Sequence, residues 1–310
     1  MSRANTLFDR RLLAGRRARA LATSRNGADF LLRVAVEDTL DRLSAIKRTF
    51  ATAIDLGGHG GHLSAALRAF PQMAQVVRAD SLVADPAGGG PDVVFDEETL
   101  PFADGSADLV VSLLQAQAVN DLPGLFAQVN RILRPDGLFL AVAAGNDTLF
   151  ELKSALTAAE AEITGGASPR GHPTLDLRDT AGLLQRAGFA IPVADVDRYT
   201  VRYDGIGDLV ADLRAMGATN ILTGRDRRPL PRALMSRADA IYRDRFADPD
   251  GRLRATFDLI ALSGWRPHES QQKPLKPGSA SVRLADALGA VEQSAGEKAA
   301  GPAGPENEDG

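Results

Sequence analysis

The sequence predicts an α/β protein built on a doubly wound, mostly parallel β-sheet, and three observations lead to this fold class. Short apolar segments alternate with segments of helical periodicity between residues 51 and 150. The apolar segments at 107–114 and 138–144 are continuous, which is typical of strands buried on both faces of a parallel sheet. The first strand ends in a glycine cluster that leads into a helix. Ligands of such sheets bind beyond the carboxyl ends of the strands.

The stretch from Ala51 to Phe70 contains this strand, the glycine cluster and the helix. Apolar residues run up to Asp55, and the glycines that follow are Gly57, Gly58, Gly60 and Gly61. Glycines allow a tight turn and a close approach of a ligand to the main chain, and a helix N-terminus offers free N–H groups. The cluster therefore fits a nucleotide-binding loop. An ordinary tight turn between a strand and a helix is the alternative that this stretch leaves open.

Acidic residues follow the next two predicted strands. Asp80 ends the second strand, about 20 residues past the glycines, where a carboxylate can accept hydrogen bonds from ribose hydroxyls. Asp96 follows the third strand with Glu97 and Glu98, and a carboxylate there can accept a hydrogen bond from an amine such as that of adenine. Helix capping is the alternative for Asp80, and simple solvation is the alternative for the three acids at 96–98.

Two helices are predicted ahead of the first strand, at residues 6–23 and 28–47, and the second has the broader apolar face. They belong to an N-terminal segment, 1–50, that we expect to pack on the domain over the end of the first strand. Arginines are frequent in this segment. We expect them to form a solvated face and not a ligand site.

The domain itself is predicted to extend over residues 51–288. Further helical periodicity at about 205–250 indicates a helical insertion, and a final strand is predicted at 257–265. The segment 289–310 is rich in Gly, Ala, Glu and Pro and has too few apolar residues to form a core. It is therefore predicted to be a disordered tail.

Composition excludes several classes of function. The 310 residues carry a net charge of -4, so no general nucleic-acid-binding surface is predicted. The chain has no cysteine, which excludes disulfides, thiol catalysis and cysteine-ligated metals. None of its 4 histidines stands at a metal-ligand spacing from another, and we predict no metal site. No apolar run approaches the roughly 20 residues that a membrane-spanning helix needs.

The motifs of residues 50–145 resemble those of the class I S-adenosylmethionine (SAM) dependent methyltransferases. The matching pieces are the glycine loop, the acid at Asp80, the segment 96–102, the strand 107–112 and the L-R-P-D-G turn at 133–137. The resemblance implies a Rossmann-like fold with a seven-stranded sheet and SAM as the cofactor. It also implies a set of cofactor-binding residues: Asp55, Gly57, Gly58, Gly61, Asp80, Ser81, Asp96, Glu97 and Ser112.

The rest of the chain resembles one narrower family, the methyltransferase-like assembly factors of respiratory complex I, which are described as hydroxylating an arginine of a quinone-site subunit. The matching segments are 8–10, 119–123, 145–152, 212–217 with Asn220, 264–265, 268–271 and 278–280. The resemblance implies an enzyme of complex I assembly with that subunit as its partner. We expect a bacterial cytoplasmic protein, at the inner face of the inner membrane, that associates with the membrane peripherally through its substrate complex.

Two positions depart from the family pattern. Gly58 and His59 stand where a cysteine and a glycine are usual, and we expect His59 either to crowd the methionine end of SAM or to change the loop conformation. Gln117 and Ala118 replace a His-Trp pair, so that Gln117 can hydrogen-bond in the pocket but cannot shuttle protons.

The candidate catalytic residues are Asp147, Gln117 and Trp265. An arginine substrate needs an acid to pair with its guanidinium and can use an aromatic ring for stacking. Asp147 and Trp265 lie in the family-specific segments and supply these groups. The alternatives are a helix cap for Asp147 and core packing at a strand end for Trp265.

Two further functions remain open at this point. One is a conventional SAM-dependent methyltransferase that acts on a small acid or an acyl carrier protein, since the generic motifs also resemble those of the biotin-pathway malonyl methyltransferase. The other is a non-catalytic assembly chaperone with a degenerate SAM loop, for which His59 is the reason.

Overall fold

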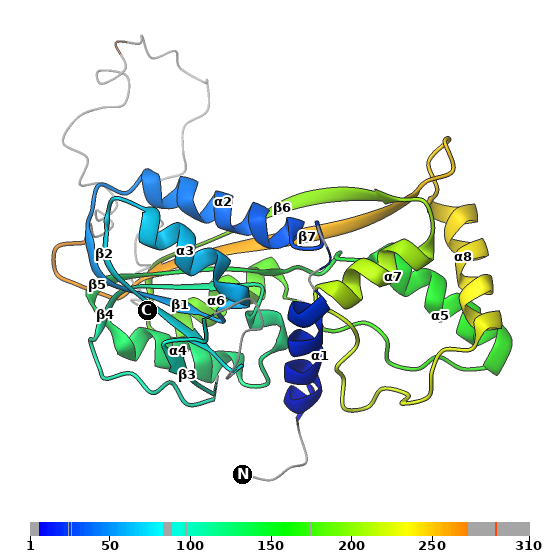
Figure 1. Cartoon of the computed structure of the whole chain (residues 1–310). Coiled ribbons are helices and arrows are strands. Elements are labelled where there is room, and N and C mark those ends of the chain that lie inside the picture. Colours follow the sequence, from blue (N-terminus) through cyan, green and yellow to red (C-terminus); the bar gives the residue numbers. More distant parts are fainter. Residues whose placement is uncertain are drawn as a thin grey trace, which may run out of the picture. The chain divides into compact units, whose positions relative to one another are not determined.

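The computed structural model describes residues 6–23, 25, 27–82, 89–96, 98–173, 175–271 and 289 (Figure 1). The strands are β1 Phe50–Leu56, β2 Met73–Asp80, β3 Val93–Val94, β4 Ala107–Leu113, β5 Leu133–Ala144, β6 Ala190–Tyr203 and β7 Leu253–Trp265. The helices are α1 Arg10–Thr23, α2 Phe30–Ser44, α3 His62–Ala69, α4 Leu122–Ile132, α5 Phe150–Thr164, α6 Leu177–Arg186, α7 Ile206–Ala215 and α8 Arg232–Phe246.

The strands of this part of the chain form a seven-stranded sheet in the order β3-β2-β1-β4-β5-β7-β6. Neighbouring strands from β3 to β5 are parallel, and β7 runs antiparallel to both β5 and β6. The order reverses at β1, because β2 and β3 lie on one side of it and β4 and β5 on the other. This arrangement confirms the predicted doubly wound, mostly parallel sheet and places the expected ligand crevice at the carboxyl end of β1.

Helices cover both faces of the sheet. In Figure 1, α2 and α3 lie over one face, and α4 and α6 lie over the other. The side chains of β4 alternate between the two cores: Leu109 and Val111 pack in the cluster under α2 and α3, and Val110 packs with Phe126 of α4. Both faces of β4 are therefore dry, which explains its continuous apolar sequence.

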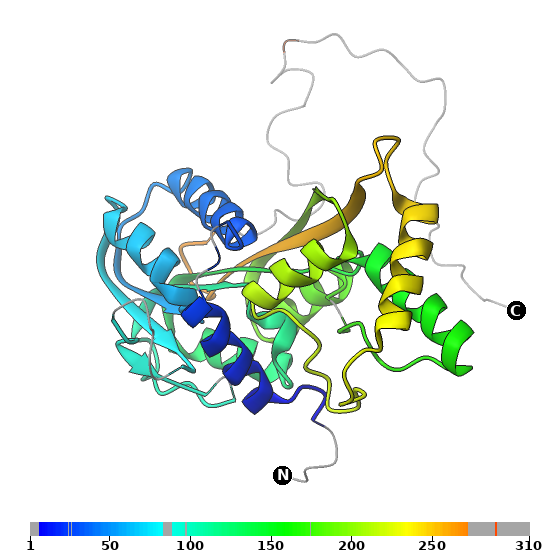
Figure 2. The same ribbon diagram turned by 45° about the vertical axis from the view of Figure 1, so that its right-hand side comes forward.

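A second hydrophobic cluster lies where the long strands β6 and β7 extend beyond the rest of the sheet. The helices α5, α7 and α8 pack there (Figure 2), around buried residues that include Tyr203, Leu209, Tyr242 and Phe257. The chain passes through α7 and α8 between β6 and β7, so these are the helices that the sequence predicts at about 205–250.

The helix α1 lies apart from both helical layers, against the loops that follow β1 and β2. It contacts α7 and stands at the carboxyl ends of the parallel strands (Figures 1 and 2). The expected position over the end of the first strand therefore describes α1, whereas α2 of the same N-terminal segment lies over a face of the sheet.

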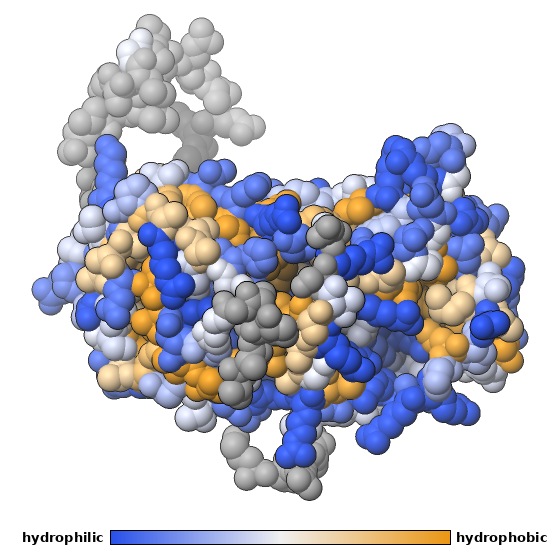
Figure 3. Space-filling view, in the orientation of Figure 1, coloured by the Kyte–Doolittle hydropathy of each residue, from blue (hydrophilic) through white to orange (hydrophobic). Residues whose placement is uncertain are grey.

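The surface around α1 mixes polar and apolar residues on the face shown in Figure 3. Within the described ranges, no helix has both the length and the hydropathy that crossing a membrane requires. Several predictions lie outside the described residues, namely Glu97, the segment 278–280 and, apart from Gly289, the tail at 289–310.

Candidate functional site

The glycine loop turns sharply between β1 and α3. Gly57, Gly58 and Gly61 have φ values of 125°, 61° and 82°, in a region that side chains disfavour. At Gly58 a Cβ atom would lie 2.4 Å from Oδ2 of Asp80. The loop backbone therefore passes directly over the carboxylate that ends β2, and only glycine allows this approach. The positive φ values and this close approach are consistent with the predicted binding loop, and the binding of a nucleotide there stays a prediction.

Asp55 and Asp80 are buried carboxylates beneath this loop. Asp55 is 2% exposed and accepts a hydrogen bond of 2.5 Å from the Ser64 hydroxyl on α3. Burial raises the pKa of Asp55 to about 6, although the Ser64 hydroxyl opposes the shift. Asp80 is 1% exposed; burial also raises its pKa, and the neighbouring Arg17 guanidinium acts against that shift.

The helix α1 supplies partners to these groups. Arg17 is only 6% exposed, and its Nη2 donates to the Gly57 carbonyl at 2.7 Å and to Oδ2 of Asp80 at 3.2 Å. Its Nη1 lies 3.4 Å from Oε1 of Gln115, a buried residue that follows β4. The expectation that the N-terminal arginines face solvent is therefore wrong for Arg17.

A second arginine of α1 reaches Asp96. Nη1 of Arg10 is 2.6 Å from Oδ1 of Asp96. Although partial burial opposes it, the backbone N–H of Glu98 and the Arg10 guanidinium lower the pKa of Asp96. A cavity of about 280 Å³ opens beside this ion pair, and α1 residues, Ser81, Phe95 and Asp96 line it. Ser81 and Asp96, two of the predicted cofactor-binding residues, thus line one cavity, and their role in binding a cofactor stays a prediction.

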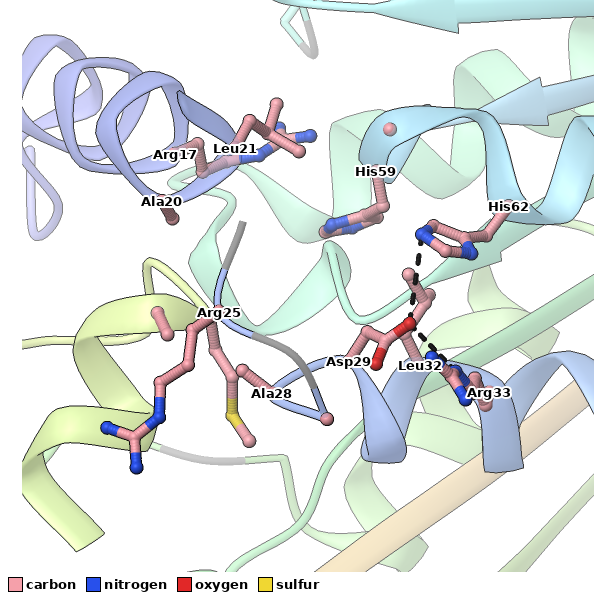
Figure 4. A pocket seen from close by; sticks show the side chains of 14 residues that line it. Arg17, Ala20, Leu21, Arg25, Ala28, Asp29, Leu32, Arg33, His59 and His62 are labelled. Carbon is pink, nitrogen blue, oxygen red and sulfur yellow. Dashed lines mark hydrogen bonds and ion pairs between the residues drawn. The ribbon is translucent and has the colours of Figure 1, made fainter. Parts of the chain in front are cut away.

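A second cavity of about 280 Å³ lies between α1, the start of α2, the glycine loop and the end of α7. Figure 4 shows Arg17 and Leu21 of α1 along one side, with Asp29 and Arg33 of α2 across from His59 and His62. Asp29 pairs with Arg33 at 2.8 Å and lies 3.9 Å from His62. The cavity therefore combines cationic side chains with a carboxylate beside the predicted cofactor loop.

His59 adopts a strained backbone conformation in this loop, with a φ of 28°. Burial lowers the pKa of His59 to about 3, and the nearby Arg17 adds to the shift, so the imidazole is neutral at neutral pH. Its Nε2 is buried and has no hydrogen-bond partner among the described residues. The positive φ shows that the loop places His59 in a conformation that side chains disfavour, and both expected effects of His59 on SAM binding stay predictions.

Replacing His59 with glycine is expected to raise the free energy of unfolding by about 1 kcal/mol, since glycine adopts a positive φ without strain. Chemical denaturation at pH 7 measures this. The matched control is Gly60→Ala, one residue on, where φ is 72° and the change should have the opposite sign. A loss of stability in His59→Gly would mean that imidazole packing outweighs the backbone strain.

Two other predicted site residues, Ser112 and Gln117, lie near the carboxyl end of β4. Ser112 is buried at the end of β4, and its Oγ has no hydrogen-bond partner among the described residues. Gln117 lies in the turn after β4, where its Nε2 donates to the Leu114 carbonyl at 2.7 Å and its buried Oε1 accepts from no described group. Both side chains are thus near the carboxyl end of β4, with polar atoms that a ligand can satisfy.

Asp147 and Trp265 do not join this cluster. Asp147 lies in the turn after β5, where Arg198 of β6 donates to it at 2.5 Å and also pairs with Asp258. It does not cap α5, whose N-cap residue is Leu149. Trp265 pairs in register with Leu138, in the first half of β5, and packs against the guanidinium of Arg48. Packing at a strand end therefore describes Trp265, and its position is remote from the glycine loop.

The family-specific segments meet around the start of α1. The Asn120 side chain bonds both the N–H and the carbonyl of Phe8, at 2.8 and 3.2 Å. The N–H of Asp9 donates to the Ile221 carbonyl at 2.8 Å, and a Cβ at Gly217 would lie 3.2 Å from Cα of Arg17. These segments therefore fasten α1 over the strand ends.

Sequence reasoning missed Arg17 and Gln115. In the structure Asp9 accepts from the Leu12 N–H in the first turn, whereas Arg10 reaches the site. One signal was present: residues 10–23 contain 5 arginines and no acid, so any buried guanidinium there needs a carboxylate from elsewhere in the chain.

The seven-stranded sheet, with a glycine loop at the carboxyl end of β1 and acids after β2 and β3, is of the methyltransferase type. The family model described as a methyltransferase domain matches residues 30–192, and the chain belongs to this family. In fold it is similar to BH2331 of Bacillus halodurans C-125, with a TM-score of 0.51 and 17% identity over 74% of this chain and 98% of that one.

Within the family, the chain is similar to the mitochondrial arginine-hydroxylase NDUFAF5 of Danio rerio, at 36% identity, with 83% of this chain and 82% of the relative covered. The human protein of the same name is 38% identical over 79% of this chain and 72% of its own. The malonyl-[acyl-carrier protein] O-methyltransferase of Laribacter hongkongensis is 34% identical over 84% of this chain and 90% of its own. At these identities the chain belongs to one family with the NDUFAF5 proteins.

Proposed function

We propose that this protein is a SAM-dependent methyltransferase-like enzyme that hydroxylates an arginine of a quinone-site subunit during the assembly of respiratory complex I. The similarity to the arginine-hydroxylases NDUFAF5 over most of both chains supports this proposal. The single structural observation that carries it is the set of convergent acceptors at the strand ends: Asp80 under Gly58, the Gly57 carbonyl and Asp96.

These residues fit SAM. The space between the Gly58 backbone and Asp80 is so small that a single Cβ at Gly58 would fill it. The buried carboxylate of Asp80 suits ribose hydroxyls. The Gly57 carbonyl suits the methionine ammonium, and Asp96 with Ser81 suits the adenine amine. The unpartnered Oγ of Ser112 is a further polar atom at this edge. When bound, SAM supplies an electrophilic sulfonium methyl group.

Hydroxylation itself needs an oxygen donor, because SAM is not an oxidant. In the part of the chain that the structure describes, no three His, Asp or Glu side chains are grouped to hold a metal ion. Gln117, whose Oε1 is buried, is the candidate that can accept a hydrogen bond from the substrate guanidinium. Asp147 could pair with that guanidinium only after releasing Arg198. The proposed place of action is the bacterial cytoplasm, at the inner face of the inner membrane, reached through the substrate complex.

A conventional methyltransferase is the second candidate, since the malonyl-[acyl-carrier protein] O-methyltransferases share 34% identity with this chain. Its substrate would be a small acid or an acyl carrier protein. A deletion strain that requires biotin would support this candidate and oppose the first.

Peptide mass spectrometry of the quinone-site subunit tests the proposal, with the subunit taken from a wild-type strain and from a strain lacking this gene. The proposal expects one arginine to lose a single oxygen atom in the deletion strain. Loss of a methyl group instead would make the protein a methyltransferase of that subunit. Identical peptides would contradict enzymatic action on this partner and leave the chaperone function as the better explanation.

A further inference from the structure

Two arginines on one face of α1 hold the two acids that a nucleoside cofactor requires. Arg10 and Arg17 are seven residues apart, which is about two helical turns, so their side chains leave the helix on the same side. Arg10 meets Asp96, which follows β3, at 2.6 Å. Arg17 meets Asp80, which ends β2, at 3.2 Å. We call Arg10 and Arg17 the arginine pair.

Arg17 makes the contacts with the loop and with Asp80 that a bound ligand would make. Its guanidinium is buried, its carboxylate partner is 1% exposed, and it also donates to the Gly57 carbonyl at 2.7 Å. A charge-assisted hydrogen bond between groups so far removed from water is stronger than one at the surface. Arg17 therefore occupies acceptors on both the β1 and the β2 side of the crevice.

The helix that carries the arginine pair is attached at defined points. Its first residues are bonded to Asn120 and to the Ile221 carbonyl, and the Arg16 guanidinium donates to the Asn220 carbonyl. The helix itself contains no acid, so both members of the pair depend on carboxylates of the domain. These attachments involve neither Asp80 nor Asp96, so they can persist when the pair releases both acids.

We propose that the arginine pair is an intramolecular competitor of SAM, so that cofactor binding requires Arg17 to leave Asp80 and Arg10 to leave Asp96. This inference rests on the proposed use of SAM. The ribose hydroxyls and the adenine amine need the same carboxylate oxygens that the guanidiniums now occupy. SAM carries an ammonium, a sulfonium and one carboxylate, a net charge of about +1, and a buried guanidinium beside a net cation is electrostatically unfavourable. The resting enzyme is therefore self-inhibited, and α1 opens as SAM enters.

Calorimetric titration with SAM tests this on the full chain. Arg17→Ala should bind SAM about tenfold more tightly than the wild type, because a buried charge-assisted contact no longer has to be broken. Arg10→Ala should tighten binding by a smaller factor, since that side chain is more exposed. The control is Arg19→Ala, which removes an exposed arginine of the same helix whose side chain, among the described residues, bonds to the Gly15 carbonyl. This control should bind as the wild type does.

Hydrogen exchange gives a readout that does not depend on turnover. Amides of residues 10–23 should exchange faster when SAM is added to the wild type, and should already exchange fast in Arg17→Ala. Slower exchange on SAM addition, or weaker binding by Arg17→Ala, would overturn the inference and make Arg17 a cofactor ligand. Because Arg10→Ala changes a side chain that is 27% exposed, it gives the sign of the effect even if Arg17→Ala does not fold.

The outcomes also separate this inference from the proposed function. If Arg17→Ala and Arg10→Ala both bind SAM with the affinity of the wild type, only the proposed competition is overturned, and SAM remains the cofactor. Absence of SAM binding in the wild type and in both variants overturns the competition together with SAM as the cofactor. The mass spectrometry of the quinone-site subunit then still decides whether the protein modifies an arginine.

Discussion

Gly58→Ala is expected to lower the free energy of unfolding by about 3 kcal/mol and to weaken SAM binding by at least about tenfold. Two effects add: the alanine must adopt a φ near 61°, and its Cβ would lie 2.4 Å from Oδ2 of Asp80 and 2.9 Å from Cβ of Asp80. The carboxylate has to move out of the cradle, which removes the acceptor proposed for ribose. Chemical denaturation and calorimetric titration measure the two effects.

Gly105 provides the matched control, because its φ is also 61° and a Cβ there would meet nothing within 4 Å. Gly105→Ala therefore reports the backbone strain alone, at about 1 kcal/mol, and should leave SAM binding unchanged. The difference between the two variants isolates the collision with Asp80. Equal losses of stability, with equal affinity for SAM, would show that the loop can move away from Asp80 and is not a rigid cradle.

Glu160→Gln is the second large expected effect, a loss of about 3 kcal/mol in the free energy of unfolding at pH 7. Glu160 of α5 is 5% exposed and accepts from Arg170 at 2.6 and 2.9 Å, and from the N–H and hydroxyl of Ser168 at 3.0 and 2.8 Å. Arg170 and Ser168 lower the pKa of Glu160 to about 2, against the effect of burial. The glutamine leaves Arg170 without its counter-charge in a buried setting.

The pH dependence of this effect has a defined sign. The folded pKa of Glu160 lies below its usual value of 4.5, so the folded protein favours the carboxylate. The stabilisation is fully present above about pH 4.5 and is lost as the pH falls toward about 2. The difference in stability between the wild type and Glu160→Gln should therefore shrink as the pH falls from about 4.5 toward about 2.

Glu162→Gln is the control on the same helix. Glu162 also forms a bidentate ion pair with an arginine, Arg237, at 2.5 and 3.1 Å, but both side chains are nearly half exposed. Exposed pairs contribute little to stability, so this variant should unfold as the wild type does. Equal losses in the two variants would contradict burial as the source of the Glu160 effect.

Glu160 also connects to the site, because it orders the segment after α5 that touches the α1 attachment. The Pro169 carbonyl accepts from the Asn220 side chain at 2.8 Å, and Nε2 of His172 accepts from the Ile221 N–H at 3.1 Å. The Asn220 carbonyl in turn accepts from Arg16 in the middle of α1, and the Ile221 carbonyl accepts from the N–H of Asp9 just before the helix. Loss of the Glu160 pair should therefore loosen α1 before it unfolds the sheet.

The sequence by itself determined the sheet, the glycine loop and the acids at the strand ends. Each of these depends on local signals: an apolar run for a strand buried on both faces, glycines for positive φ, and a carboxylate where a strand ends. Asp55, Asp80 and Asp96 then come together because parallel strands bring their carboxyl ends to one edge. No long-range contact has to be known for that inference.

Only the tertiary structure decided what faces these acids. The partners of Arg10 and Arg17 are more than sixty residues away in the sequence, and a helix rich in arginine looks solvated until its acids are found. The same holds for Asp147, whose guanidinium partner is Arg198 of the chain itself, and for Trp265, which lies by Arg48. Periodicity reports which face of a helix is apolar, but the choice of an ion-pair partner depends on how the helix packs against the sheet, and that is a property of the folded chain.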